Sequence, residues 1–384
     1  MRAPSIRILS PQIDLLYEID RYTSLQFERS WQGVGEWELH LPGSQNLNIL
    51  TEGNLVLLGA DGHRAGIIRG VRQEDAGSGI EVVLTGQTLN GLAAQRYTLP
   101  LEDGYNGGYD NVPALTSAAE NPVPVPAETI LKTYAARHLT APADAKRKIP
   151  GLILSPDLGR GRAAVWMSRY EQLDAVLQLV SEYTDTGWEI FIDLNRRNLV
   201  FDVIPGVDRT TGQDKNSRVI FSMEFESAES LAYYHDVSNY RNLAYAGGAG
   251  EGAQRLVLKV TNDLEEPAGL ERFETFIDCG ALELTETDTT MSLSEEGKHK
   301  LLESPRTESL TATVAQSGSF LYGRHWNLGD LVTVVDRSAG VARDARVTRV
   351  AERYEAGAYS LEATFGEAPQ HLARAIRQLK NIAR

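Results

Sequence analysis

The side chains that most often carry out catalysis are few and scattered in this sequence. The seven histidines form no HExxH or HxxxH pattern and have no cysteine partner nearby, so a zinc peptidase site is not predicted. The single Cys279 excludes an internal disulfide bond. It follows an alternating stretch, FETFIDC, with no histidine near it in the sequence, so a small buried apolar role is favoured over that of a nucleophile.

The acidic residues are the remaining candidates for chemistry. Carboxylate pairs of the kind that hydrolyse glycosides arise freely in a chain with 52 Asp and Glu, so no pair is singled out. A metal could bind near Glu286 and Asp288, but a role for Asp288 or a following Thr as a helix cap is favoured. We therefore predict no catalytic residue, no cofactor and no metal ligand, and we expect the protein not to be an enzyme.

Length, composition and charge restrict the class of protein. The chain has 384 residues, 42% of them hydrophobic and 8% aromatic, which predicts a globular protein of two to three domains. No apolar run is long enough to span a bilayer, and the N-terminus lacks the apolar core of a secretory signal. The net charge of −14 argues against a dedicated nucleic-acid binder. An acidic channel wall, however, would let DNA pass without holding it.

Residues 1–98 are predicted to be a β-domain, because short β-rich stretches alternate there with turn residues. In GEWELHLP, for example, Trp37, Leu39 and Leu41 fall on one face of the strand, with polar residues on the other. So many short strands in about 100 residues indicate a barrel or a sandwich.

Residues 99–236 are predicted to be an α+β insertion. It opens with a long loop rich in Gly and Pro, whose Tyr105 and Tyr109 could contact a partner. Helices are expected in AETILKTYAARHL and in the segment beginning SRYEQLD. In the second, Ser168 and Glu171 are predicted to form a capping box, and Gly187 to end the helix before a strand hairpin.

The remainder is again rich in β-strand patterns. Residues 237–366 are predicted to be a second β-domain with one embedded helix, SLSEEGKHKLLES. Residues 367–384 read as an amphipathic helix. Its basic residues, which we expect to face a partner, are Arg374, Arg377 and Lys380.

A short pattern occurs in both β-domains. One copy begins GNLVLL at Gly53 and the other GDLVTV at Gly329, and each continues as strand, turn, strand, turn and strand to a glycine, Gly86 or Gly366. Glycine tolerates positive φ, and an Asx side chain can cap the turn that starts the strand. Two unrelated β-meanders are the alternative to a true repeat. The residues that we assign to this assembly motif are Gly53, Asn54, Leu55, Val56, Trp326, Leu328, Gly329, Asp330, Leu331 and Val332. Trp326 is expected either to fill a barrel or to contact another subunit.

Four stretches carry a resemblance to a known family: LTEGNLVLL, FERSWQGVGEWELHLP, ERFETFIDC and WNLGDLVTVV. The sequence resembles the siphophage baseplate hub or distal tail-tip proteins, which are related to the N-terminal hub region of tail-associated lysins. The resemblance implies a mainly β fold with two tube-type β-barrel domains, a smaller α/β domain and a C-terminal helix. It also implies a homotrimer in which paired barrels make a pseudo-sixfold ring.

The resemblance further implies a location and partners. The protein would lie at the virion tail tip, with the distal tail protein and tail tube ring above it. Tape-measure and receptor-binding or fibre components would lie below it, and DNA would pass through without membrane insertion of the protein. Two alternatives from other classes remain: a cell-wall hydrolase of the tail-associated lysin type, and a carbohydrate-binding module.

Overall fold

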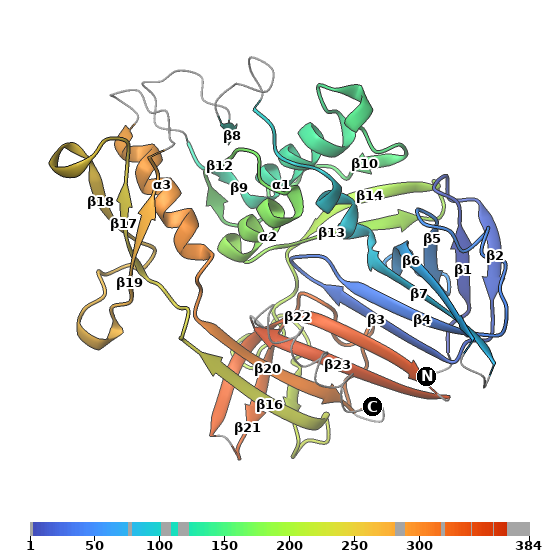
Figure 1. The fold of residues 1–384 in the computed structure, drawn as a ribbon. Coiled ribbons are helices and arrows are strands. Elements are labelled where there is room, and N and C mark those ends of the chain that lie inside the picture. Colours follow the sequence, from blue (N-terminus) through green and yellow to red (C-terminus); the bar gives the residue numbers. More distant parts are fainter. Residues whose placement is uncertain are drawn as a thin grey trace. The chain divides into compact units, whose positions relative to one another are not determined.

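The structure is a computed structural model that describes residues 3–75, 79–100, 109–113, 123–280, 289–315, 319–338, 340–355 and 357–366. These residues form two compact units. The first takes its described residues from 1–113, 123–232 and 311–366, and the second from 233–310. The predicted fold class is confirmed: the chain is mainly β, with a smaller helical part (Figure 1).

One large sheet dominates the first unit, and residues 233–236 and 307–310 of its strands fall in the second. Its 13 strands run in the order β16-β20-β23-β22-β3-β4-β7-β6-β5-β1-β2, with β21 beside β22 and β15 beside β21. The strands of this sheet are β1 (Ile6–Leu9), β2 (Leu15–Ile19), β3 (Ser24–Ser30), β4 (Glu36–Pro42), β5 (Leu55–Leu58), β6 (Ala65–Asp75), β7 (Ile80–Thr88), β15 (Ile220–Ser222), β16 (Ala228–Asp236), β20 (Thr307–Val314), β21 (Leu331–Asp336), β22 (Val341–Glu355) and β23 (Ala358–Gly366).

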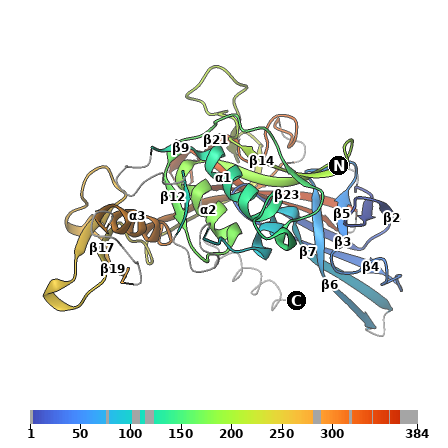
Figure 2. The same ribbon diagram turned by 90° about the horizontal axis from the view of Figure 1, so that it is seen from above.

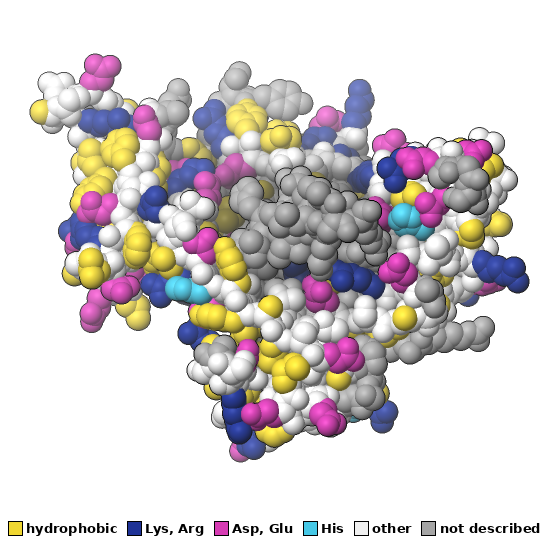
Figure 3. Space-filling model, turned by 60° about the horizontal axis from the view of Figure 1, so that its bottom comes forward, with side chains coloured by type: hydrophobic (Ala, Val, Ile, Leu, Met, Phe, Trp, Pro, Cys, Tyr) yellow, Lys and Arg dark blue, Asp and Glu magenta, His cyan; other side chains and the backbone are white. Residues whose placement is uncertain are grey.

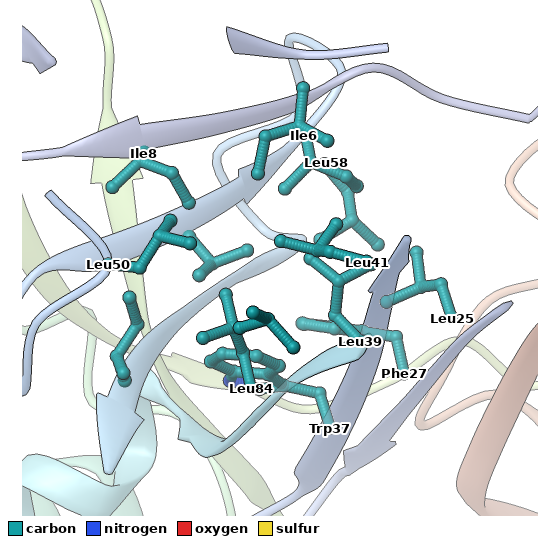
Figure 4. Packing of buried hydrophobic residues seen from close by; sticks show 14 of the residues in the cluster. Ile6, Ile8, Leu25, Phe27, Trp37, Leu39, Leu41, Leu50, Leu58 and Leu84 are labelled. Atoms are coloured by element: carbon teal, nitrogen blue, oxygen red, sulfur yellow. The ribbon is translucent and has the colours of Figure 1, made fainter. Parts of the chain in front are cut away.

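Alternating apolar side chains create the core between these strands. In β4, Trp37, Leu39 and Leu41 are buried while Glu36 and Glu38 are exposed, as their spacing predicts. They meet apolar side chains from the neighbouring strands in one cluster (Figure 4). Burying each such side chain contributes about 1.5–3 kcal/mol, so this cluster holds the sheet in shape.

The segment between β7 and β15 carries most of the helices of the first unit. Its helices are η1 (Leu89–Gln95), α1 (Ala127–Ala135), a π-helical turn (Ala136–Thr140), a short 3-10 turn (Ala145–Arg147) and α2 (Leu173–Thr184). Its strands are β8 (Asp110–Val112), β9 (Val125–Pro126), β10 (Leu152–Leu154), β11 (Ala163–Ala164), β12 (Trp166–Ser168), β13 (Gly187–Asp193) and β14 (Asn198–Ile204). Helices α1 and α2 contact one another, and α1 also contacts β14.

Two local predictions in this segment are wrong. Ser168 does not cap a helix, because it ends β12, which pairs with β8, and α2 begins only at Leu173. Gly187 does not end α2, because Asp185 already takes the left-handed conformation there, with φ 51°. Gly187 instead begins β13.

The second unit is a small sheet with one helix against it (Figure 2). Strand β17 (Leu243–Gly247) lies in the middle, antiparallel to β18 (Val257–Thr261) and parallel to β19 (Glu274–Asp278). Helix α3 (Thr289–Leu302) contacts β17 and β18 and buries Leu293 and Leu301. Two single 3-10 turns, Gly252–Gln254 and Gly269–Glu271, lie in its loops.

The compact units divide the chain at positions other than the predicted domain boundaries. The segment predicted as one β-domain, 237–366, is shared between the two units, because 311–366 clusters with the first. The reason is hydrogen bonding: β22 pairs along Arg349–Glu355 with β3, far away in the sequence. The division into two closed tube-type barrels, with boundaries at 98, 236 and 366, stays a prediction.

Candidate assembly site

The two parts of the large sheet share one strand order. The first repeat, as we call β3 to β7, runs β3-β4-β7-β6-β5. The second repeat, made of β16 and β20 to β23, runs β16-β20-β23-β22-β21. The main difference lies in one connection, because residues 31–35 join β3 to β4 whereas 237–306 join β16 to β20.

The predicted motif opens β5 in the first repeat. Gly53 has φ 89°, and its N–H donates to the carbonyl oxygen of Ile68 at 3.0 Å. The N–H of Ile68 donates in return to the carbonyl oxygen of Asn54 at 2.9 Å. The β6–β7 register then shifts between Ile68 and Gly70, which is a bulge.

The second repeat reproduces this geometry at β21. Gly329 has φ 90°, and its N–H donates to the carbonyl oxygen of Val347 at 2.8 Å. The N–H of Val347 donates to the carbonyl oxygen of Asp330 at 2.9 Å, and the register shifts between Val347 and Arg349. The same turn, exchange of hydrogen bonds and bulge thus occur twice.

The Asx side chains of the motif are buried but make different contacts. The Asn54 amide donates to the carbonyl oxygen of Ile49 at 2.8 Å. The Asp330 carboxylate accepts from the N–H of Asn327 at 2.9 Å and from Nε of Arg209 at 2.6 Å. Asp330 therefore also fastens the segment before β15 to the start of β21.

The apolar residues of the motif point mostly into the protein. Leu55, Val56 and Val332 are buried, and Leu328 and Leu331 are partly buried. Trp326 is fully buried, with its ring edge-on to Phe221 at a centroid distance of 5.2 Å. The ring thus packs within its own chain, and its role in filling a barrel stays a prediction.

Trp31 joins the two repeats, a role that the sequence patterns do not predict. It lies in the β3–β4 turn, is fully buried and donates through Nε1 to the carbonyl oxygen of Ile204 at 3.0 Å. A Cβ on Gly329 or on Gly187 would overlap its indole ring. The guanidinium of Arg346 lies over the ring at 4.8 Å. The only available signal was the tryptophan in a Gly-rich turn, SWQGVG.

A buried polar cluster also crosses between the repeats. Arg64, just before β6, donates through Nε and Nη2 to the two carboxylate oxygens of Glu352 in β22, at 2.9 Å each. The hydroxyls of Tyr354 and Tyr359 donate to the same carboxylate at 3.1 and 3.2 Å. A charge-assisted pair with this fork geometry is among the stronger polar contacts in proteins.

The other predicted contact residues are mostly not described. Tyr105, the metal candidates Glu286 and Asp288, and the helix residues Arg374, Arg377 and Lys380 lie outside the described residues. Tyr109 is described and is partly buried just before β8, with its carbonyl oxygen 3.4 Å from the Asn111 amide. Its role as a partner contact stays a prediction.

Cys279, the possible metal-binding side chains and the helices each bear on a functional role of the protein. Burial raises the pKa of the Cys279 thiol to about 11, so the reactive thiolate is disfavoured at neutral pH. In the part of the chain that the structure describes, no His, Cys, Asp and Glu side chains gather in a group fit to hold a metal ion. Within that same part, every helix is too short or too polar to cross a membrane.

The His63–Glu189 contact gives a testable pH dependence. Nδ1 of His63, in the β5–β6 turn, lies 2.6 Å from the Glu189 carboxylate in β13, and this hydrogen bond raises the pKa of His63 above 6.5. Its stabilising contribution is therefore complete below about pH 6.5 and is lost as the pH rises through the raised pKa. We expect His63→Ala to lower the thermal midpoint at about pH 6 and to change it less at about pH 9. An equal loss at both pH values would contradict this assignment.

One known protein family matches almost the whole chain. The model of the Siphovirus ReqiPepy6 Gp37-like protein family matches residues 5–367. No curated protein sequence matches the chain.

Three solved structures of tail proteins share the fold. The tail protein of Neisseria meningitidis MC58 is 13% identical, with a TM-score of 0.51 over 95% of this chain and 97% of that one. The 43 kDa tail protein of prophage MuSo2 from Shewanella oneidensis is 12% identical, with a TM-score of 0.51 over 94% and 97%. Prophage tail protein gp18 of Listeria monocytogenes EGD-e is 9% identical, with a TM-score of 0.50 over 99% of both. The chain therefore belongs to the Siphovirus ReqiPepy6 Gp37-like protein family and has the fold of phage tail proteins.

Proposed function

We propose that the protein is a structural component of the tail tip, a hub whose copies form a homotrimeric ring that closes the tail tube. The observation that carries this proposal is the repeat: one chain holds two β segments with the same strand order and the same Gly-Asx turn. Three such chains would offer six similar segments around a ring, which suits a junction between a sixfold tube and a threefold device.

The charge of the chain suits a conduit for DNA. A net charge of −14 disfavours strong binding of phosphates. On the face shown in Figure 3, the acidic and basic side chains of the described residues are interspersed. In this proposal the ring adjoins the distal tail protein and the tail tube, holds host-recognition components and acts without catalysis.

The oligomeric state in solution tests the proposal. We expect sedimentation or light scattering of the purified chain to show a trimer whose fraction rises with protein concentration, because the ring needs copies of the chain alone. Electron microscopy of that species should show a ring with a central opening. A chain that stays monomeric at every accessible concentration, or that forms only dimers, would contradict it.

A further inference from the structure

The strand β22 shows how the two repeats are joined within one chain. Its first part, Val341–Arg346, pairs with β21, and its second part, Arg349–Glu355, pairs with β3. Strand β23 lies along the opposite edge of the second part. The second repeat thus gives half a strand to the edge of the first.

The matching strand of the first repeat has the same shape but lacks that neighbour. In β6, Ala65–Ile67 pairs with β5, and β7 lies along Gly66–Asp75. Among the described residues, no strand pairs with the other edge of Gly70–Glu74. Strand β16, which matches β3, likewise ends the sheet with one open edge among the described strands.

Side-chain exposure agrees with a missing neighbour. In β22, Val350, Glu352 and Tyr354 share one face and are 1–3% exposed, and Tyr354 packs into the core of the first repeat. The bulges align these residues with Val71, Gln73 and Asp75 of β6. All residues from 71 to 75 are exposed, and Val71 is an apolar side chain with 37% of its surface in solvent.

We propose that the Gly70–Glu74 edge of β6 pairs with β16 of a second copy of this chain, as β22 pairs with β3 within one copy. This inference rests on the proposed ring and names the surfaces that build it. Each chain then has one donor edge and one acceptor edge, so the contact is head-to-tail and closes when the rotation completes a circle. The second copy is the fitting occupant because the chain already contains the same joint once.

The two kinds of joint differ in chemistry. The joint within the chain buries the Arg64–Glu352 pair, whereas the open edge carries Arg72, Glu74 and Asp75 at its surface. Charges on an exposed edge keep it from pairing with unrelated strands. The joint between copies is therefore the more hydrated of the two, and salt should weaken it more.

A cross-linking experiment tests the pairing. The chain has one cysteine, and it is buried, so introduced cysteines can be labelled selectively. We would prepare Gln73→Cys and Ala232→Cys as separate chains, both at exposed positions, and treat their mixture with a bismaleimide that tolerates a one-residue shift in register. A cross-linked dimer is expected in the mixture and in neither chain alone. A chain with both changes should give a covalent species of trimer mass.

The edge strand β2 supplies the matched control. Tyr17 is 46% exposed in β2, which ends the sheet at the side opposite to β16, and no described strand of the second repeat matches β2. A mixture of Tyr17→Cys with Ala232→Cys should therefore give no cross-link. If the chain is a trimer by mass but the Gln73 mixture fails, or the Tyr17 mixture reacts instead, the pairing is wrong and the ring stands. If the wild-type chain never associates, the ring proposal itself fails.

Discussion

Replacing Gly329 by alanine should destabilise the protein far more than the same change at Gly53. Both glycines have φ close to 90°, so both changes carry the backbone cost of a non-glycine residue there, about 1–2 kcal/mol. At Gly53 an added Cβ meets nothing within 4 Å. At Gly329 it would overlap the indole of Trp31, which cannot retreat because it is hydrogen-bonded to Ile204 and fully buried. Such overlap adds about 1–3 kcal/mol.

Urea unfolding of the two variants measures the difference. We expect a loss of about 1–2 kcal/mol for Gly53→Ala and about 2–5 kcal/mol for Gly329→Ala, with unchanged slopes. Each variant is the control for the other, since they share backbone conformation and side-chain change. Equal losses would show that Trp31 does not join the repeats as the structure indicates.

Removing the Glu128 carboxylate should lower the free energy of unfolding by a similar amount. Glu128 is completely buried at the start of α1 and accepts hydrogen bonds from Nζ of Lys132 at 2.6 Å and from Nε and Nη2 of Arg160 at 2.9 and 2.8 Å. Glu128→Ala leaves Lys132, itself almost fully buried, without its main counter-ion. Breaking a buried pair in this way costs about 3–5 kcal/mol.

The control is an exposed ion pair, and the pH dependence gives a second check. Glu18→Ala, which breaks a pair with Arg7, should cost no more than about 1 kcal/mol. Burial raises the pKa of Glu128, but the hydrogen bonds from Arg160 and Lys132 outweigh burial and lower it to about 2. The stabilisation is thus present above the unfolded pKa of about 4.5 and lost as the pH falls through about 2. The difference in the free energy of unfolding between wild type and Glu128→Ala should therefore become smaller on acidification. A difference that stayed constant would contradict this assignment.

The strands were predictable because their side chains alternate. Trp37, Leu39 and Leu41 in β4 needed only the period of a pleated strand, and the Gly-Asx turns needed only the tolerance of glycine for positive φ. Tertiary context defeated two local patterns. Ser168 has the spacing of a capping box with Glu171, yet strand pairing with β8 fixes its backbone as extended. Gly187 resembles a helix stop, but its lack of a Cβ makes room for Trp31.

The pairing of distant strands was not predictable from one sequence. The β22–β3 ladder joins Arg349 to Ser30 across most of the chain, and periodicity reports only which face of a strand is apolar, not which strand lies beside it. The Arg64–Glu352 pair was missed for the same reason, because a chain with 52 acids and 38 bases offers too many possible partners. The sequence shows the repeated Gly-Asx motif, but it does not show that one edge of β6 lacks a neighbouring strand.

The long connection between β16 and β20 bears on how the chain folds. Residues 237–306 stand where the first repeat has a five-residue turn. If they were disordered, closing a loop about 14 times longer would cost roughly 2 kcal/mol more in conformational entropy. These residues build a sheet and helix of their own, so the insert can order itself first and present its two ends together. The connection between β16 and β20 is therefore a position at which evolution can exchange one inserted domain for another. A different insert at this point would leave the strand pairing of the large sheet unchanged.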